Sequence, residues 1–294
     1  MSQPRPNASP DPARPSELRA FFAQLDFHPK KRLGQHFLIS PQVADRILQA
    51  ANISPEDRVL EVGAGAGALT VRLARSAAFT IAVELDPQLT ALLSELLPDR
   101  ARVQVLQADI LRVELGELLA AGKWKALGNL PYYITGPVLG RLIEQRRSLA
   151  VIVVMVQKEV AERIVSPPGS KEYGALSVMA QTFFAVKREM VVKRSQFYPQ
   201  PEVDSAVVSL TPQAEPPVAS EEEAGFERVV RAAFAHRRKT LENSLLEAGF
   251  AGGREAVGAA LQAAGVEAGR RAESLSIAEF VRLAREFKAG GQGD

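Results

Sequence analysis

The sequence predicts an α/β fold: an open, mostly parallel sheet of seven strands that ends in an antiparallel hairpin, followed by a small all-helical C-terminal domain. Strand-like runs in the first half of the chain alternate with helical patterns, which is typical of a parallel sheet covered by helices. A run rich in Pro, Ala and Gln at 211–220 then precedes a region with a wholly helical hydrophobic period. We therefore expect a disordered arm at 1–15, an α/β domain at 16–212 and a helical domain at 213–294.

The composition is that of an ordinary globular protein, and it excludes several kinds of site. Of the 294 residues, 46% are hydrophobic and 24% are charged, and no apolar run approaches the length of a membrane span. The absence of cysteine excludes disulfides and thiolate metal sites, and three scattered histidines do not favour a metal centre. The first residues lack the apolar segment of a signal peptide, so we expect a cytoplasmic protein.

The N-terminal part combines an arm, a helix and a basic loop. Residues up to about 15 are rich in Pro, Ala and Ser, and an apolar stripe predicts a helix at 16–25. The loop at 30–38 begins with Lys30, Lys31 and Arg32 and ends with Gln35, His36, Phe37 and Leu38. We expect it to contact phosphate at its basic end and a small ligand at the other. A solvated surface of mixed charge is the alternative, because the formal net charge is only +2.

Strand-like residues at 58–62 lead into alternating glycines and then into a helical pattern at 68–75. Such a turn, here with Gly63 and Gly65, lets the backbone approach a ligand closely. The strand at 79–84 ends in Glu84, at the spacing where a carboxylate can accept ribose hydroxyls, and Asp109 follows the next strand. A tight turn with a satisfied surface carboxylate is the structural alternative.

The glycine spacing favours a nucleoside ligand without phosphates over a dinucleotide. The spacing is G-x-G-x-G, in contrast to the G-x-G-x-x-G of dinucleotide sites, and Glu61 stands just before it. Pyrophosphate binding requires a helix N-terminus without a nearby acid. S-adenosyl-L-methionine therefore fits better, with its ribose at Glu84 and its adenine at Asp109.

Asn129 follows the strand predicted at 123–127 and should face the same crevice, because ligands bind outside the carboxyl ends of the strands in an open sheet. Pro131 makes the Leu130 carbonyl part of a tertiary amide and favours an extended Leu130. The Asn129 side chain adds a second acceptor, and Tyr132 supplies a flat face. Two acceptors and an aromatic plane suit an exocyclic amine on a flat heterocycle. An ordinary strand-to-turn junction with a buried tyrosine is the alternative.

The second half of the chain completes the sheet and forms the helical domain. Strands are predicted at 150–156, 189–192 and 205–210, the last two as the antiparallel hairpin. Prolines stiffen the segment between the strands at 189–192 and 205–210. This segment can hold Phe197 or Tyr198 as an aromatic wall, and core burial of Phe197 is the alternative. In the helical domain, a basic turn between two amphipathic helices carries Arg237, Arg238 and Lys239.

Five motifs in combination resemble the rRNA adenine dimethylase family, most nearly its KsgA-type bacterial members. They are LGQHFL at 33–38, EVGAGAGALT at 61–70, NLPYYIT at 129–135, FYPQPEVDS at 197–205 and HRRKTLENSL at 236–245. The resemblance covers the chain from about Phe27 to Arg285. His36 stands where Asn is also seen, Ala64 where Pro is common, and Tyr133 where Asn is an alternative. The resemblance implies a Rossmann-like sheet that uses S-adenosyl-L-methionine for methyl transfer.

The resemblance also implies roles for individual residues. The cofactor would be held by Gln35, His36, Leu38, Gly63, Gly65, Glu84, Asp109 and Asn129. The catalytic site would consist of Asn129, Leu130, Pro131, Tyr132 and Phe197. RNA would be bound by Lys30, Lys31, Arg32, Arg237, Arg238 and Lys239, and no metal is implied.

The activity that the resemblance implies is dimethylation at N6 of two adjacent adenosines in the 3′-terminal hairpin loop of 16S rRNA. The enzyme would be a cytoplasmic monomer that acts on an assembling small ribosomal subunit, with no membrane partner. A large-subunit rRNA methylase of the antibiotic-resistance type is one alternative, although HRRKTLENSL and the helical tail favour the first. The other is an RNA- or DNA-binding factor in which methylation is lost or sidelined; Glu84, Asp109 and NLPY argue against lost cofactor binding.

Overall fold

The computed structural model describes residues 10–97, 102–120, 122–236, 238–250 and 252–289. The chain forms two compact units. The first unit comprises Met1–Ala161 with Lys187–Pro212, and the second comprises Glu162–Val186 with Gln213–Asp294. The sequence predicts a single boundary between residues 212 and 213. The grouping of 162–186 with the C-terminal helices therefore differs from that expectation.

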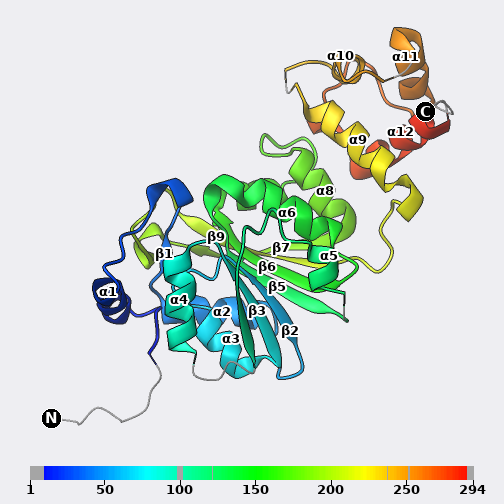
Figure 1. Ribbon diagram of the computed structural model, residues 1–294. Helices are drawn as coiled ribbons and strands as arrows, with labels where there is room; N and C mark the ends of the chain where they lie inside the picture. The colour runs from blue at the N-terminus through cyan, green and yellow to red at the C-terminus, as the bar shows by residue number, and fades with distance from the viewer. Residues whose placement is uncertain (1–9, 98–101, 121, 237, 251, 290–294) are drawn as a thin grey trace. The chain divides into compact units, whose positions relative to one another are not determined.

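A seven-stranded sheet has the order β4-β3-β2-β5-β6-β9-β7 (Figure 1). Its strands are β2 (Arg58–Val62), β3 (Phe79–Glu84), β4 (Val103–Gln107), β5 (Trp124–Asn129), β6 (Leu149–Gln157), β7 (Phe184–Val192) and β9 (Ser205–Pro212). The strand pairs β2–β3, β3–β4, β2–β5 and β5–β6 are parallel, and the pair β6–β9 is antiparallel. The predicted open, mostly parallel sheet of seven strands is confirmed. Because β2 pairs with β3 on one side and with β5 on the other, the strand order reverses there, which is where an open sheet binds ligands.

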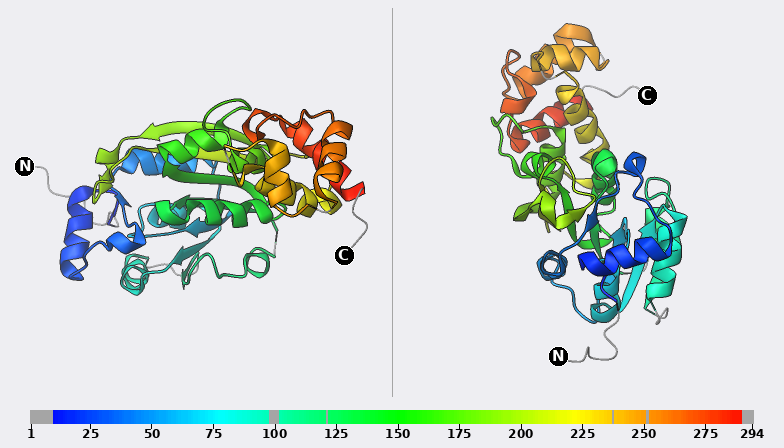
Figure 2. Two further views of the ribbon diagram at one scale, coloured as in Figure 1. Left: turned by 90° about the horizontal axis from the view of Figure 1, so that it is seen from above. Right: turned by 90° about the vertical axis from the view of Figure 1, so that its left-hand side faces the viewer.

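Helices cover both faces of this sheet, as two further views show (Figure 2). In chain order, the helices up to residue 165 are α1 (Pro15–Gln24), α2 (Pro41–Ala50), α3 (Thr70–Ser76), α4 (Pro87–Leu96), α5 (Leu115–Leu118), α6 (Thr135–Glu144) and α7 (Lys158–Val165); of these, α1 packs on α4 and not on the sheet. The first turn of α2 has a cap, because the Ser40 hydroxyl accepts a hydrogen bond from the Val43 N–H at 3.4 Å. Apolar side chains of α2 and α3, such as Ile47 and Leu73, join Val153 of the sheet in one core cluster.

Residues 10–14 are anchored to the fold, although the sequence predicts a disordered arm at 1–15. The Arg72 guanidinium donates to both carboxylate oxygens of Asp11, at 2.8 and 2.9 Å, and Ala13 is fully buried. Leu18 and Phe22 of α1 then pack in one cluster with Leu89 and other residues of α4. The arm is therefore shorter than predicted, because these contacts compensate the entropy of ordering the segment. Residues 1–9, the rest of the predicted arm, lie outside the described residues.

The second unit is built mainly from helices, as predicted for the C-terminal region. These are α8 (Ala175–Phe183), α9 (Glu223–Phe234), α10 (Leu241–Glu247), α11 (Gly253–Ala263) and α12 (Ile277–Ala289). The ring centroids of Phe183 and Phe226 lie 6.3 Å apart, and those of Tyr173 and Phe234 lie 6.0 Å apart. These aromatic contacts explain why 162–186 belongs with α9 and its neighbours. Among the described residues, no helix has the length and apolar character needed to cross a membrane.

Several short elements complete the chain. Strands β1 (Phe37–Leu38) and β8 (Phe197–Tyr198) form a separate antiparallel pair. The 3₁₀ helices are η1 (Lys31–Leu33), η2 (Tyr132–Ile134), η3 (Arg194–Gln196), η4 (Ser220–Glu222) and η5 (Ala272–Ser274). Two of these, η1 and η2, border the pocket described next.

Candidate active site

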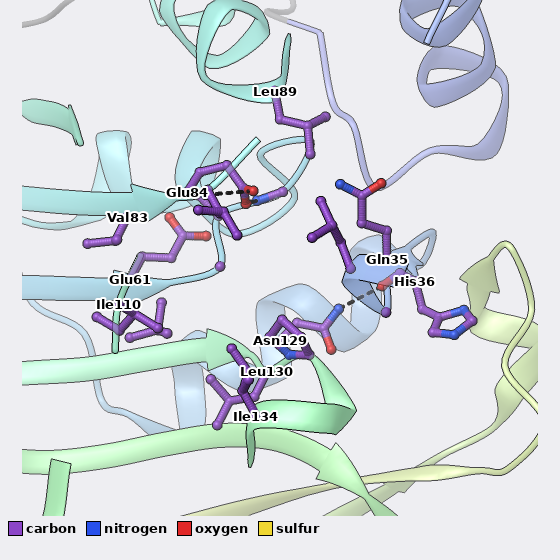
Figure 3. Close-up of a pocket in the computed structure, with 18 of the residues that line it drawn as sticks. Gln35, His36, Glu61, Val83, Glu84, Leu89, Ile110, Asn129, Leu130 and Ile134 are labelled. Atoms are coloured by element: carbon purple, nitrogen blue, oxygen red, sulfur yellow. Dashed lines mark hydrogen bonds between the residues drawn. The ribbon is translucent and has the colours of Figure 1, made fainter. Parts of the chain in front are cut away.

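A pocket of about 210 Å³ lies outside the carboxyl ends of β2, β3 and β5 (Figure 3). All eight residues that the resemblance assigns to the cofactor line it: Gln35, His36, Leu38, Gly63, Gly65, Glu84, Asp109 and Asn129. Leu130, Pro131 and Tyr132 line it as well. Residues from five separate segments of the chain therefore meet at the point where the strand order reverses.

The glycine turn forms one wall of the pocket from backbone atoms. Gly63 and Gly65 have φ angles of +71° and +58°, which side-chain-bearing residues rarely adopt. A Cβ atom placed on Gly65 would only touch the Phe37 ring, at 3.4 Å, so the positive φ angle and not a lack of space favours glycine here. The Gly65 N–H donates to Oε2 of Glu84 at 2.8 Å. The turn is thus fastened to the acidic end of β3.

Glu84 is held rigidly at the pocket. Its Oε1 atom accepts hydrogen bonds from the backbone N–H groups of Leu85 and Asp86, both at 2.9 Å, in addition to the bond from Gly65 to Oε2. The residue is 8% exposed, and burial raises the pKa of this carboxyl above its usual range. A buried carboxylate with fixed orientation is suited to accept hydrogen bonds from a pair of ribose hydroxyls.

Asp109 is the second acid of the pocket and is more open to solvent. Its Oδ1 atom accepts a hydrogen bond from the Leu111 N–H at 2.9 Å, which orients the carboxylate just beyond β4. The adjacent Ile110 and Leu111 also line the pocket, so an apolar surface lies beside the acid. This combination suits a flat ring that carries an amine. Ile110 and Leu111 were not predicted from the sequence, because apolar residues after a strand carry no distinguishing signal.

The Asn129 amide has a fixed orientation. Its Nδ2 atom donates to the backbone carbonyl of His36 at 2.9 Å, which leaves Oδ1 as an acceptor (Figure 3). The neighbouring backbone is also fixed: the Leu130 N–H donates to the carbonyl of Met155 at 3.0 Å. The Pro131 carbonyl accepts from the Thr135 hydroxyl at 3.2 Å. The loop that contains His36 therefore determines which atom Asn129 offers to a ligand.

Tyr132 is braced by contacts at both its hydroxyl and its ring. The hydroxyl lies 2.7 Å from Oγ of Ser205, within hydrogen-bonding distance. The ring stacks on the His36 imidazole, with centroids 5.6 Å apart and planes at 26°. His36 is itself held, because Nδ1 lies 2.7 Å from the Pro199 carbonyl oxygen. Tyr132 is thus presented in a single orientation at the pocket.

The structure places Phe197 in the core and not in the pocket. The residue is 3% exposed and packs with Leu38, Val192 and Val207, whereas the neighbouring Tyr198 is 39% exposed. Pairing of β8 with β1 brings Phe197 opposite Leu38. The predicted aromatic wall at Phe197 is therefore wrong, and the alternative of core burial describes this residue.

Glu61 is a pocket residue that was not predicted from the sequence. It is 1% exposed, it lines the pocket, and its Oε2 atom has no hydrogen-bond partner. Burial, together with the charge of Glu84, raises the pKa of this carboxyl to about 8. Hydrogen bonding by Thr70 acts in the opposite direction and lowers the pKa of this carboxyl, but burial is the larger effect. An acid flanked by Leu60 and Val62, close before the glycines, was the available signal.

The raised pKa of Glu61 predicts a specific pH dependence of stability. The folded protein keeps a proton that the unfolded chain releases, so the unfolding free energy should fall as the pH rises from 4.5 to about 8. Glu61→Gln should remove this part of the slope, and the exposed control Glu56→Gln should keep it. Thermal unfolding of the cofactor-free protein across that pH range measures the effect. Equal slopes in the parent and in Glu61→Gln would contradict it.

The predicted RNA-binding residues differ in their exposure and in their contacts. Lys31 and Arg32 are exposed, whereas Lys30 is bonded to the buried carboxylate of Asp86. In the second unit, Arg238 is exposed, and Lys239 forms an ion pair with Glu247. Arg237 lies outside the described residues.

The pocket residues fit S-adenosyl-L-methionine. The backbone cradle at Gly63 and Gly65 and the acids Glu84 and Asp109 match the ribose and the adenine of an adenosine. Together with the seven-stranded sheet, they define a methyltransferase that depends on S-adenosyl-L-methionine.

Residues 26–289 match the family described as ribosomal RNA adenine dimethylase. The chain belongs to this family. It is 45% identical over 265 residues to the ribosomal RNA small subunit methyltransferase A of Geobacter metallireducens, covering 89% of this chain and 96% of the relative. It is 44% identical over 291 residues to the protein of the same name from Pelotomaculum thermopropionicum, covering 95% and 99%.

Solved structures give the same class. A dimethyladenosine transferase from Plasmodium falciparum is similar at a TM-score of 0.73 and 26% identity, covering 86% of this chain and 98% of that one. The 23S rRNA methyltransferase ErmE is similar at a TM-score of 0.64 and 29% identity, covering 86% and 99%. The resemblance found in the sequence motifs is therefore confirmed at the level of the family and of the enzyme class.

Proposed function

We propose that this enzyme dimethylates N6 of two adjacent adenosines in the 3′-terminal hairpin loop of 16S rRNA during late assembly of the small ribosomal subunit. The observation that carries the proposal is the Asn129 amide, whose Nδ2 donates to the His36 carbonyl and thereby leaves Oδ1 to accept from an amine. The Leu130 carbonyl is proposed as the second acceptor. The names of the curated relatives support the small-subunit substrate. The enzyme is proposed to act as a monomer in the cytoplasm.

The proposed chemistry follows from the weakness of adenine N6 as a nucleophile, because its lone pair is delocalised into the ring. When bound, S-adenosyl-L-methionine supplies an electrophilic methyl group on a cationic sulfur. In the first transfer, Asn129 Oδ1 and the Leu130 carbonyl accept the two N6 hydrogens and thereby aim the lone pair at the donor side of the pocket. In the second transfer, N6 keeps one hydrogen, so one of the two acceptors holds it. Orientation of this kind is worth several orders of magnitude in rate.

Asn129 acts in this proposal as an orienting acceptor and not as a base. A neutral amide cannot take up a proton at pH 7. The proton on N6 becomes acidic only after the methyl group has been transferred, so it can then leave to solvent. The chemistry therefore requires two well-placed acceptors and no strong base before the attack.

The target adenine must leave its stack to reach the pocket, and Tyr132 is placed to hold it there. One face of the Tyr132 ring is covered by His36, so the base is proposed to stack on the opposite face. Stacking on an aromatic side chain is worth about 1–3 kcal/mol per base. Because Phe197 is buried in the core, the proposal assigns no base contact to it.

Charge reversal at Arg238 and Lys239 is expected to weaken binding of the rRNA hairpin. Removing one interaction with a phosphate should lower the slope of log K against log salt by roughly 0.7–0.9. The measurement is the hairpin affinity of Arg238→Glu/Lys239→Glu over a series of salt concentrations. Arg46→Glu, at an exposed position of α2 outside the predicted basic clusters, is the control. An unchanged slope in the double variant would remove these two residues from the RNA interface.

The proposed function is tested by incubating the enzyme with labelled S-adenosyl-L-methionine and under-methylated small subunits, followed by mapping of the modified bases. Two dimethylated adenosines in the 3′-terminal loop of 16S rRNA are expected. A second candidate, methylation of 23S rRNA, is favoured by the similarity to ErmE. Large subunits in a parallel reaction distinguish the two, because label confined to 23S rRNA would replace the proposed substrate.

A further inference from the structure

Asp86 is a buried carboxylate that joins three parts of the first unit. Its side chain is 0% exposed and forms an ion pair with Lys30, whose Nζ lies 2.8 Å from Oδ2 and 3.0 Å from Oδ1. Oδ2 also accepts from Nε2 of Gln35 at 3.0 Å, and Oδ1 accepts from the Gln88 N–H at the start of α4 at 3.2 Å. Capping a helix needs one oxygen of this carboxylate, so the contacts to Lys30 and Gln35 require a separate explanation.

The same residues connect the basic loop to Glu84 through an unbroken chain of hydrogen bonds. The Lys30 N–H donates to Oε1 of Gln35 at 2.7 Å, so both ends of the Gln35 amide are engaged by protein atoms. The Asp86 N–H in turn donates to Oε1 of Glu84 at 2.9 Å, and Oε2 of Glu84 accepts from Gly65. The chain therefore runs from Lys30 to the glycine turn.

This series of hydrogen bonds also affects the part of the pocket that contains Asn129. The loop that Lys30 and Gln35 pin down contains His36, whose carbonyl holds Asn129. A shift of the loop would move that carbonyl and release the Asn129 amide. Neither Lys30 nor Asp86 is among the residues that line the pocket, so both can influence a ligand only through their neighbours.

We infer that Lys30 and Asp86 are positioning residues for the cofactor pocket, and that Lys30 serves as the counter-ion of Asp86 and not as a phosphate contact. A buried carboxylate without a partner is costly, which ties the Lys30 ammonium to this site. The RNA contacts of the basic loop then fall to Lys31 and Arg32, which are exposed. The assignment of RNA contacts to Lys31 and Arg32 rests on the proposed function, whereas the role of Lys30 and Asp86 in cofactor binding does not.

Lys30→Met is the test, and Lys31→Met is its matched control, because it makes the same substitution at the adjacent, exposed lysine. Calorimetry with S-adenosyl-L-methionine in the absence of RNA should show roughly tenfold weaker binding for Lys30→Met, as expected from the loss of a charged hydrogen bond that holds the loop. Lys31→Met should bind the cofactor like the parent. Equal cofactor affinity in Lys30→Met and Lys31→Met would overturn the inference.

The salt dependence of hairpin binding provides a reciprocal readout. Lys31→Met should lower the slope of log K against log salt, and Lys30→Met should leave it unchanged. A reduced slope in Lys30→Met with normal cofactor affinity would return Lys30 to the RNA interface. If the parent fails to methylate rRNA, the proposed function fails, but the cofactor titration still decides the role of Lys30 and Asp86.

A double-mutant cycle separates positioning from general destabilisation. Asp86→Asn keeps a good helix cap and removes the charge that pairs with Lys30. If the two residues act as one unit, Lys30→Met/Asp86→Asn should bind the cofactor no more weakly than the weaker single variant. Fully additive losses of cofactor affinity would show that the two residues act independently and would overturn the inference. If Lys30→Met folds poorly, Asp86→Asn alone should still bind the cofactor more weakly than the parent, and parent-like cofactor affinity in that variant would overturn the inference.

Discussion

Replacing Asn129 by alanine is expected to lower the rate constant of the methyl-transfer step at least about 100-fold, because a misplaced reacting group alone can cost this much. The substitution removes Oδ1, one of the two acceptors that would orient adenine N6, and it removes the hydrogen bond to His36. Binding of the rRNA hairpin should be largely kept, because Asn129 lies in the pocket. The measurement is single-turnover methyl transfer with saturating cofactor and RNA.

Asn129→Asp provides the matched comparison. It keeps an acceptor oxygen and the shape of the side chain, but it replaces Nδ2 by an oxygen that would face the His36 carbonyl. Two oxygens cannot share a hydrogen bond without a proton, so the side chain should rotate and transfer should remain slow. Parent-like turnover in Asn129→Ala would refute the orienting role, whatever the behaviour of the aspartate variant.

Glu84→Ala is expected to weaken binding of S-adenosyl-L-methionine by at least about 100-fold, because hydrogen bonds to a charged group contribute roughly 1.5–3 kcal/mol each and a ribose would lose two of them. The substitution also leaves the N–H groups of Gly65, Leu85 and Asp86 without their acceptor. Calorimetry with the cofactor and no RNA measures the loss.

The effect on the fold is separated from the effect on the ligand by the thermal midpoint of the cofactor-free protein. Glu84→Gln restores most of the volume but places an amide among three N–H donors, so it should also bind the cofactor weakly. Glu95→Gln, at an exposed position of α4, should bind the cofactor like the parent. Normal cofactor affinity in Glu84→Ala would remove Glu84 from the cofactor site, and tight binding of NAD by the parent would revive the dinucleotide interpretation.

Local features of the sequence were sufficient to predict most of the pocket. Three short-range patterns were used: alternating glycines, an acid at the end of one strand, and a second acid just after the following strand. Parallel strands bring their carboxyl ends together at one edge of the sheet, so these residues are expected to meet there. Gly63, Glu84, Asp109 and Asn129 could therefore be placed in one crevice from these patterns, and all four line the pocket.

Phe197 shows where local pattern was insufficient. Neighbouring residues in a strand point to opposite faces, so either Phe197 or Tyr198 had to face the core. The pairing of β8 with β1 decides this choice, and it joins residues far apart in the chain. The same limit applies to Glu61, since only the packing around β2 shows that its carboxyl is buried.

The sequence by itself determined the fold class, the family and the identity of the acids and glycines in the pocket, because these depend on the order and spacing of neighbouring residues. Only the tertiary structure assigned Lys30 to Asp86, 56 residues away, and thereby moved it from the basic surface to the support of the cofactor pocket. A cluster of lysines and arginines is equally basic whether or not one member is paired. Contacts between distant segments decide which member of the cluster has a buried counter-ion. Such contacts produce no local pattern in the sequence.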